Sequence, residues 1–503
     1  MKPELNLGAW RHLNGAEGGH VLGLPAEHLV THGVVVGMTG SGKTGLLTVM
    51  IEEAARAQVP TIVVDVKGDL PNLLLAFPSF DPATLVPWVE RDRDALSAEA
   101  IAAQAAELAA RRRAELSEWS IGEPELAAYT AATSVRVLTP GGTAGEPLHM
   151  LSSLERRSPR WDKDPEAARN ALSAAVSLVL RLLGREPDPA KSREHVLLSV
   201  LAERRLAAGQ TAELGALMQD VLEPPIGQIG ALSVDAFMKK TERRNLAAAL
   251  NSLLAAPTFA GWRQGVTLDV GEWLKPESGP APNRERTPIV IVSVAHLDDE
   301  ERALVLGVLL EEILSWVRTL RGSQHLRALL VFDEVYGFLP PHPANPPTKR
   351  PLVALMKQAR AFGVGVVVAT QNPMDLDYRA LSNAGLWFLG RLQTDADRAR
   401  VLDGLAAAHG TTDAGEELGT TLQRLAPRWF VVRNAHVACP PILVQPRYAM
   451  SLMRGPMTRV EIRAARGVVD EEDSANARAE TGAASSSDPW TGTKSDGALS
   501  TVS

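Results

Sequence analysis

The chain has 503 residues, of which 45% are hydrophobic and 22% charged, and its formal net charge is −7. This length allows two or three domains with sizeable cores. Because the net charge is mildly negative, any contact with nucleic acid must come from local basic segments and not from the overall charge. A single cysteine, Cys439, excludes a disulfide framework and a cysteine-rich metal site. Neither a signal-peptide core nor an apolar run of the roughly 20 residues that a membrane span requires is present. We therefore expect a cytoplasmic protein with no direct membrane insertion.

A short lead-in, residues 1–30, comes before the first unit with a clear pattern. The apolar run Gly33–Val36 predicts a buried strand, and residues 45–58 predict a helix. Between them, residues 37–44 read Gly-Met-Thr-Gly-Ser-Gly-Lys-Thr, which fits the phosphate-binding loop pattern G-x-x-x-x-G-K-[ST]. The alternative, a glycine-rich turn that binds nothing, does not explain why a strand precedes the loop and a helix follows it.

This loop has the residue types that a triphosphate site requires. Glycines let backbone N–H groups surround phosphate oxygens, and the following helix adds the positive end of its dipole. Lys43 is predicted to reach the β- and γ-phosphates as part of the catalytic set, and the Thr44 hydroxyl to bind a metal. We therefore expect ATP and Mg²⁺ as cofactors. The predicted nucleotide-binding residues are Gly37, Met38, Thr39, Gly40, Ser41, Gly42, Lys43, Thr44 and Gly45.

Beyond the loop, the pattern alternates between strands and helices. A second buried strand, residues 60–66, leads into Asp65-Val66-Lys67-Gly68-Asp69. Residues 81–285 have mostly helical spacing, with one predicted strand at 135–138, and the arginine runs 111–113 and 204–205 are predicted to be solvated helix faces. Further strands are predicted at residues 289–294, 329–334, 364–369 and 386–392.

This order of elements predicts an α/β fold, in which a parallel sheet is covered by helices on both faces. We expect one core formed by residues 31–80 and 286–465, with residues 81–285 as a large helical insertion. Residues 466–503 have the composition of a disordered tail.

Two adjacent acids, Asp333 and Glu334, follow a run of apolar residues at the end of a predicted strand. Taken alone, such a pair is typical of a solvated strand end. Beside a phosphate loop, Asp333 is the candidate Mg²⁺ ligand, and Glu334 is the candidate base that polarises the attacking water. The pair therefore favours hydrolysis over nucleotide binding alone.

Gln371 and Arg360 complete the candidate catalytic set. Gln371 ends the next strand, where its amide can hydrogen-bond the γ-phosphate or its water, although a loop residue fits equally well. Arg360 lies on the helix before that strand, and its guanidinium suits developing phosphoryl charge, in cis or from a neighbouring subunit. The alternative for Arg360 is a surface arginine on an amphipathic helix.

Together these segments resemble the FtsK–HerA superfamily of ring-forming ATPases, and bacterial HerA-like proteins in particular. The resemblance implies a RecA-like core, Mg²⁺ and ATP, and a hexameric ring that moves on double-stranded DNA. It also implies that Arg360 enters the adjacent subunit's site and that Gln371 acts as a sensor. Arg391 is a candidate further phosphate contact, with a structural ion pair as the alternative. The segments that carry the resemblance are residues 37–44, 65–69, 330–334, 357–365, 369–373, 381–394 and 452–456.

Many HerA helicases have an N-terminal β-barrel, and the 36 residues before the loop are too few for it. We therefore expect the barrel, and the surface that docks the NurA nuclease, to be absent. Lys349 and Arg350 follow a proline-rich loop and are candidate DNA contacts.

Three functions fit these observations. The first is an ATP-hydrolysing hexameric motor that translocates on or unwinds double-stranded DNA. The second is a coupling ATPase of conjugation or secretion, for which a partner would have to supply the membrane anchor. The third is a regulatory or defence-associated NTPase that scaffolds a nuclease or another effector protein.

Overall fold

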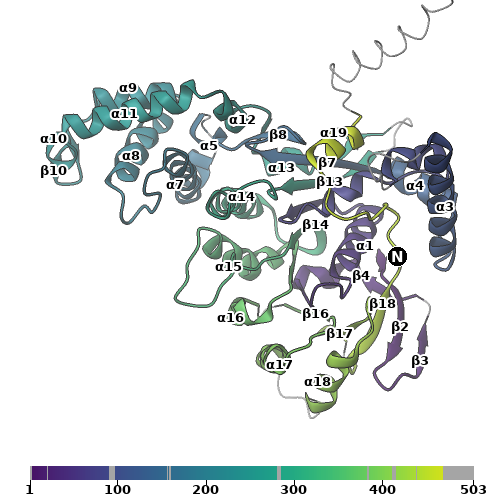
Figure 1. Ribbon diagram of the computed structural model, residues 1–503. Helices are drawn as coiled ribbons and strands as arrows, with labels where there is room; N and C mark the ends of the chain where they lie inside the picture. Colours follow the sequence, from purple (N-terminus) through teal and green to yellow (C-terminus); the bar gives the residue numbers. More distant parts are fainter. Residues whose placement is uncertain are drawn as a thin grey trace, which may run out of the picture.

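The computed structural model describes residues 3–19, 21–89, 97–155, 157, 160–279, 285–381, 384–409, 415–437 and 439–467. Of the predicted tail, all residues from 468 onward lie outside this described part of the chain. Figure 1 shows a central twisted sheet with helices on both sides and a helical arm at one end.

The main sheet is parallel through most of its width, as the sequence predicts. Its parallel strands are, in spatial order, β11 (Val266–Thr267), β8 (Glu146–His149), β7 (Thr133–Pro140), β13 (Glu285–Ser293), β6 (Thr61–Asp65), β14 (Ser323–Asp333), β15 (Phe362–Thr370), β5 (Gly33–Val36) and β16 (Leu386–Leu389). The sheet continues antiparallel through β17 (Phe430–Asn434), β18 (Ile442–Pro446), β2 (Gly8–His12) and β3 (Glu17–Gly19). The predicted α/β fold is thus confirmed, and the lead-in supplies two strands to the sheet.

Both faces of the sheet are buried, which explains why its strands are continuous apolar runs. In β5, Val34 and Val36 pack into one hydrophobic core, whereas Val35 points into the other. The helices that contribute to the first core include α7 (Pro165–Leu182), α14 (Asp299–Thr319) and α15 (Lys349–Gln358). Those that contribute to the second include α1 (Lys43–Arg56), α3 (Ala98–Ser117) and α4 (Glu123–Ala132).

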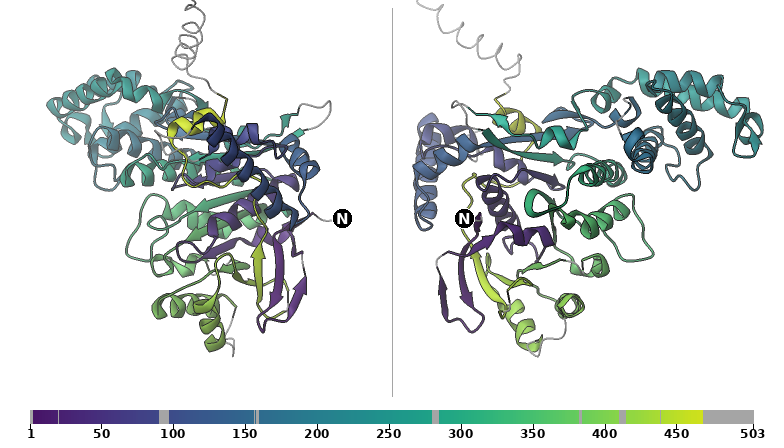
Figure 2. Two further views of the ribbon diagram at one scale, coloured as in Figure 1. Left: turned by 45° about the vertical axis from the view of Figure 1, so that its right-hand side comes forward. Right: turned by 180° about the vertical axis from the view of Figure 1, so that it is seen from behind.

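Residues 81–285 are mostly helical and also supply strands to the main sheet. The predicted strand at 135–138 is confirmed as part of β7, which lies between β8 and β13. Helices α8 (Arg193–Ala207), α9 (Leu214–Leu222) and α11 (Lys240–Ala255) form the arm that projects from one end of the sheet (Figures 1 and 2). The division of the chain into domains stays a prediction.

The remaining elements are short and connect the larger ones. The strands are β1 (Glu4–Asn6), β4 (Gly23–Pro25), β9 (Gln228–Ile229), β10 (Leu232–Ser233) and β12 (Glu277–Ser278). The helices are η1 (Ala26–Thr31), η2 (Leu70–Leu74), α2 (Pro82–Leu85), η3 (Val86–Trp88), α5 (Ser152–Glu155), α6 (Arg160–Lys163), α10 (Val234–Phe237), η4 (Pro257–Phe259), α12 (Ala260–Arg263), α13 (Val270–Trp273), η5 (Ala359–Ala361), η6 (Pro373–Asp375), α16 (Tyr378–Leu381), α17 (Asp395–His409), α18 (Gly415–Arg424) and α19 (Arg459–Ala465). None of the helices in the described ranges has both the length and the apolar character needed to cross a membrane.

The arginine runs are less solvated than predicted. Arg112 is buried, and its guanidinium donates hydrogen bonds to the carbonyls of Met450 (2.7 Å) and Ser451 (3.4 Å). Arg205 is only partly exposed and forms an ion pair with Asp220. The prediction is therefore wrong for these two side chains, because each satisfies polar groups of a neighbouring segment that the local sequence does not reveal.

Candidate active site

The parallel sheet gathers the predicted site residues at one edge. The phosphate loop follows β5, Glu334 follows β14, Gln371 follows β15, and Arg391 comes shortly after β16. These strands are consecutive in the order β14–β15–β5–β16, and β6 lies on the far side of β14. Because parallel strands end at the same edge, segments hundreds of residues apart in sequence meet there.

The phosphate loop has the backbone conformation that its glycines permit. Gly40 and Gly42 have φ values of 77° and 96°, a region that L side chains rarely adopt. Gly42 is the N-cap of α1, and no side chain accepts a hydrogen bond from the backbone at this cap. The first N–H groups of α1 are therefore free of a side-chain cap, which suits the binding of an anion.

Lys43 is folded back over the loop. Its Nζ donates hydrogen bonds to the carbonyls of Gly37 (2.5 Å) and Met38 (3.0 Å), and its side chain is buried. Burial, with a further contribution from the positive charge of Lys67, lowers the pKa of Lys43 to about 8. The ammonium group is thus held at the centre of the loop by carbonyls that a phosphate oxygen can replace.

Asp333 has the environment expected of a metal ligand. The carboxylate is 2% exposed, and its Oδ2 atom has no hydrogen-bond partner among the described residues. Burial raises its pKa to about 7, and the positive charge of Lys67 offsets the lost solvation only in part. Its neighbour across the strand pair, Asp65, instead accepts hydrogen bonds from Ser293 Oγ (2.8 Å) and Gly68 N–H (2.9 Å). An unsatisfied buried carboxylate beside the phosphate loop fits a divalent cation.

Glu334 is held from three sides. Its Oε2 atom lies 2.6 Å from Lys67 Nζ, and Oε1 accepts hydrogen bonds from Thr370 Oγ1 and from the Gln371 N–H, both at 3.1 Å. Its φ of 61° is unusual for a residue other than glycine. The sequence analysis missed the role of Lys67, although its place just after β6 puts it at the same sheet edge.

Gln371 and Arg391 both contact the phosphate loop. Gln371 Oε1 accepts a hydrogen bond from Thr39 Oγ1 at 2.5 Å. The Arg391 carbonyl accepts one from the Met38 N–H at 3.0 Å, and its side-chain Nε is buried with no partner in the described part of the chain. The structure therefore brings both predicted residues to the loop.

Arg428 also contacts the loop and was not predicted. Its N–H donates to the Ser41 carbonyl at 3.0 Å, and its guanidinium carbon lies 3.6 Å from the ring centroid of Tyr448. A Cβ atom on Gly42 would lie 3.1 Å from the Arg428 Cα, so the two segments are closely packed. No motif marks Arg428 in the sequence, because its position depends on the antiparallel strands that follow it.

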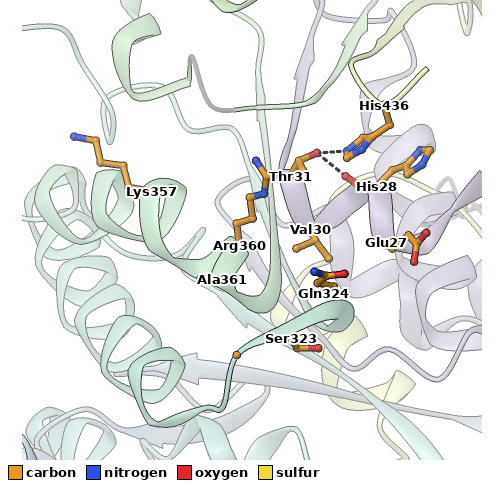
Figure 3. Close-up of a pocket in the computed structure, with 11 residues that line it drawn as sticks. Glu27, His28, Val30, Thr31, Ser323, Gln324, Lys357, Arg360, Ala361 and His436 are labelled. Atoms are coloured by element: carbon orange, nitrogen blue, oxygen red, sulfur yellow. Dashed lines mark hydrogen bonds between the residues drawn. The ribbon is translucent and has the colours of Figure 1, made fainter. Parts of the chain in front are cut away.

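Arg360 lies at the opposite edge of the sheet. It belongs to η5, just before the nine-residue strand β15, whose length corresponds to about 30 Å. There Arg360 lines a cavity of about 850 Å³ beside Thr31 and His436 (Figure 3). The His436 ring stacks on His28 at a centroid distance of 4.2 Å and lies 2.7 Å from Thr31 Oγ1. Arg360 is thus too far from the phosphate loop of its own chain to act in cis.

The two candidate DNA contacts differ in exposure. Lys349, at the start of α15, lies with its Nζ 3.4 Å from Asp377 Oδ2 and donates to the Ala344 carbonyl at 3.2 Å. Arg350, the next residue, is exposed. Of the pair, Arg350 is therefore the side chain better placed to meet an external phosphate.

This fold, a parallel α/β sheet with a phosphate-loop sequence between β5 and α1, is the arrangement typical of P-loop proteins. The family model that matches the chain describes the helicase HerA-like C-terminal domain and aligns with residues 12–78. This match confirms the superfamily resemblance for the segment that contains the phosphate loop.

Several solved structures are similar at low identity, two of those described below over most of the chain and one over about a third. VirB4 of Thermoanaerobacter pseudethanolicus has 13% identity and a TM-score of 0.48, with 88% of this chain and 96% of that chain covered. The bacterial conjugative coupling protein TrwB has 12% identity and a TM-score of 0.46, with coverages of 90% and 91%. The genome packaging NTPase B204 of Sulfolobus turreted icosahedral virus 2 has 13% identity and a TM-score of 0.22, with coverages of 32% and 69%. No curated protein matches the chain in sequence.

Proposed function

We propose that the protein hydrolyses ATP with Mg²⁺ and works as a ring-forming motor on double-stranded DNA. The observation that carries the ATPase part is the convergence of the phosphate loop, Asp333, Glu334 and Gln371 on one sheet edge. Together these residues provide the groups that enzymes of phosphoryl transfer commonly use: a phosphate-binding loop, a metal ligand, a general base and a residue that positions the attacking water.

Each residue of the candidate site has a proposed role in ATP hydrolysis. The backbone N–H groups of residues 37–45 and the Lys43 ammonium hold the phosphates, and the Thr44 hydroxyl with the Asp333 carboxylate holds the metal. Glu334 accepts a proton from the attacking water, which Gln371 orients beside the loop. Mg²⁺, when bound, neutralises charge on the phosphate oxygens. Arg391, whose buried Nε is unsatisfied within the described residues, contributes a further phosphate contact.

The position of Arg360 supports a ring. Its guanidinium lies across the sheet from the phosphate loop, so Arg360 itself cannot stabilise the transferring phosphoryl group within its own chain. A head-to-tail arrangement, in which the edge with Arg360 faces the nucleotide of the next chain, completes every site. Such heterologous contacts close into rings when the rotation between subunits permits. From the superfamily resemblance we propose six subunits and duplex DNA as the track, and we also propose a cytoplasmic location.

The experiment that tests this proposal measures nucleotide binding and turnover separately. Lys43→Ala should abolish binding, whereas Glu334→Gln should bind ATP normally and stop turnover. Glu107→Gln, an exposed glutamate on α3, is the matched control and should behave as wild type. Full turnover in the Glu334 variant would refute its assignment as the base.

Linear duplex DNA separates the motor from the alternatives. A motor should hydrolyse ATP faster when duplex DNA is added. A scaffolding NTPase should not respond and should instead co-purify with an effector protein. A coupling ATPase of conjugation or secretion should respond fully only with its membrane partner.

A further inference from the structure

We infer that Lys67 is a positioning residue that restrains Glu334, so that a chain without its partners hydrolyses ATP slowly. This inference rests on the proposed role of Glu334 as the base. The Lys67 Nζ lies 2.6 Å from Glu334 Oε2, and the two residues are 267 positions apart in the sequence. Only the pairing of β6 with β14 brings them together.

The restraint acts on the oxygen atoms that a base must use. Oε1 of Glu334 already accepts two hydrogen bonds, from the Thr370 hydroxyl and the Gln371 N–H. Lys67 donates a hydrogen bond to Oε2, so the Glu334 carboxylate, which can accept about four hydrogen bonds, already accepts three. A general base must reach the proton that it abstracts, directly or through one water, and the donors on Glu334 compete with that water for its oxygen atoms.

Partial burial strengthens the electrostatic attraction between Lys67 and Glu334. The Glu334 side chain is 12% exposed and that of Lys67 is 30% exposed, so solvent screens their attraction less than that of a surface pair. Glu334 also has little freedom to turn away, because the Thr370 hydroxyl and the Gln371 N–H hold its other oxygen, Oε1. Lys67, on a long flexible stem, is the partner that can move.

The loop that carries Lys67 is fastened to a distant segment. The Gly68 carbonyl accepts a hydrogen bond from the Met457 N–H at 3.0 Å, and Asn72 Nδ2 donates to the Gly455 carbonyl at 2.7 Å. Lys67 and Glu334 are therefore held by different parts of the chain. The Gly68 N–H also donates to Asp65 Oδ1 at 2.9 Å, so a displacement of residues 455–457 would loosen the loop that carries Lys67 without removing any hydrogen bond of Glu334.

The test is the ATP turnover of the purified protein without DNA. Lys67→Met, which removes the charge and keeps an unbranched chain, should raise turnover about tenfold, a fraction of what a general base contributes. Its affinity for a non-hydrolysable ATP analogue should stay within about twofold of wild type. Lys67→Arg, which keeps the charge, should give a smaller increase. Lys275→Met, in an exposed lysine–glutamate pair with Glu272, is the matched control and should not change turnover.

A double variant shows whether the effect passes through the glutamate. Glu334→Gln and Lys67→Met/Glu334→Gln should both be inactive, because the effect of the lysine on turnover passes through the base. If Lys67→Met folds poorly, Lys67→Gln replaces it, and it should also raise turnover. Equal or lower turnover in a folded, nucleotide-binding Lys67 variant would overturn the restraint and leave the ATPase proposal intact. Turnover that persists in Glu334→Gln would instead refute the proposed function itself.

Discussion

Arg447 and Glu52 form an ion pair in which both side chains are fully buried, with Arg447 Nη1 2.9 Å from Glu52 Oε2. The other Arg447 terminal nitrogen, Nη2, binds Glu53 Oε1 at 2.8 Å. Glu52 also accepts hydrogen bonds from the N–H groups of Met450 (3.0 Å) and Ser451 (2.9 Å). Since Glu52 lies on α1, the helix that begins at Lys43, this network joins the segment after β18 to the element that carries the phosphate loop.

Arg447→Met should lower the free energy of unfolding by about 3–5 kcal/mol, because it leaves the buried Glu52 carboxylate without its ion-pair partner and Glu53 with Arg56 alone. Urea denaturation followed by circular dichroism measures the loss. Arg113→Met, at an exposed position on α3, is the control and should stay within about 0.5 kcal/mol of wild type. A similar small loss in Arg447→Met would mean that water or rearrangement satisfies the glutamates.

His32 should make the fold sensitive to acid. The ring is 1% exposed, and its Nδ1 accepts a hydrogen bond from the Val366 N–H at 3.1 Å. Burial, with a smaller contribution from the charge of Arg360, lowers its pKa from 6.5 to about 4. The unfolded chain therefore binds the proton more tightly, and the stability that neutral His32 provides above pH 6.5 is lost as the pH falls towards 4.

The comparison with His32→Asn isolates this effect, because asparagine keeps an acceptor and does not titrate in this range. Between pH 7 and pH 5, wild type should lose about 2 kcal/mol more stability than the variant. Parallel pH profiles for the two proteins would show that His32 is protonated or solvated in the folded state.

Arg360→Ala should bind ATP normally and lose about a thousandfold or more in turnover, because the transferring phosphoryl group loses its arginine. Mixing two inactive variants shows which chain supplies the arginine. Arg360→Ala keeps an intact nucleotide site, and Lys43→Ala keeps an intact Arg360. If Arg360 acts in trans, mixed assemblies should regain turnover at interfaces where one subunit of each kind meets, whereas recovery should be absent if each site uses its own chain.

Arg350→Ala should weaken binding to duplex DNA and reduce the slope of log affinity against log salt concentration by about one. Lys349→Ala should have a smaller effect, since its ammonium lies 3.4 Å from the Asp377 carboxylate. Fluorescence anisotropy over a salt series measures both slopes, with Arg113→Ala as the control. An unchanged slope in Arg350→Ala would remove this end of α15 from the DNA-binding surface.

The sequence alone determined the type of fold and the chemistry of one site. Short, continuous β-branched runs such as Gly33–Val36 and Thr61–Asp65 are typical of inner strands of a parallel sheet, so their length and composition predict them directly. The phosphate loop is equally readable, because its glycine, lysine and threonine spacing satisfies local backbone geometry that needs no distant partner. Asp333 and Gln371 followed from the rule that functional groups gather where parallel strands end.

Only the tertiary structure decided which distant side chains meet. The ion pair of Lys67 with Glu334, the contact of Arg428 with the phosphate loop and the burial of Arg112 all join segments whose approach depends on strand order. The separation of Arg360 from the loop likewise follows from the length of β15. Periodicity reports which face of an element is buried, but it carries no information on which other element covers that face. The neighbours of a charged side chain are therefore set by the global packing of the chain.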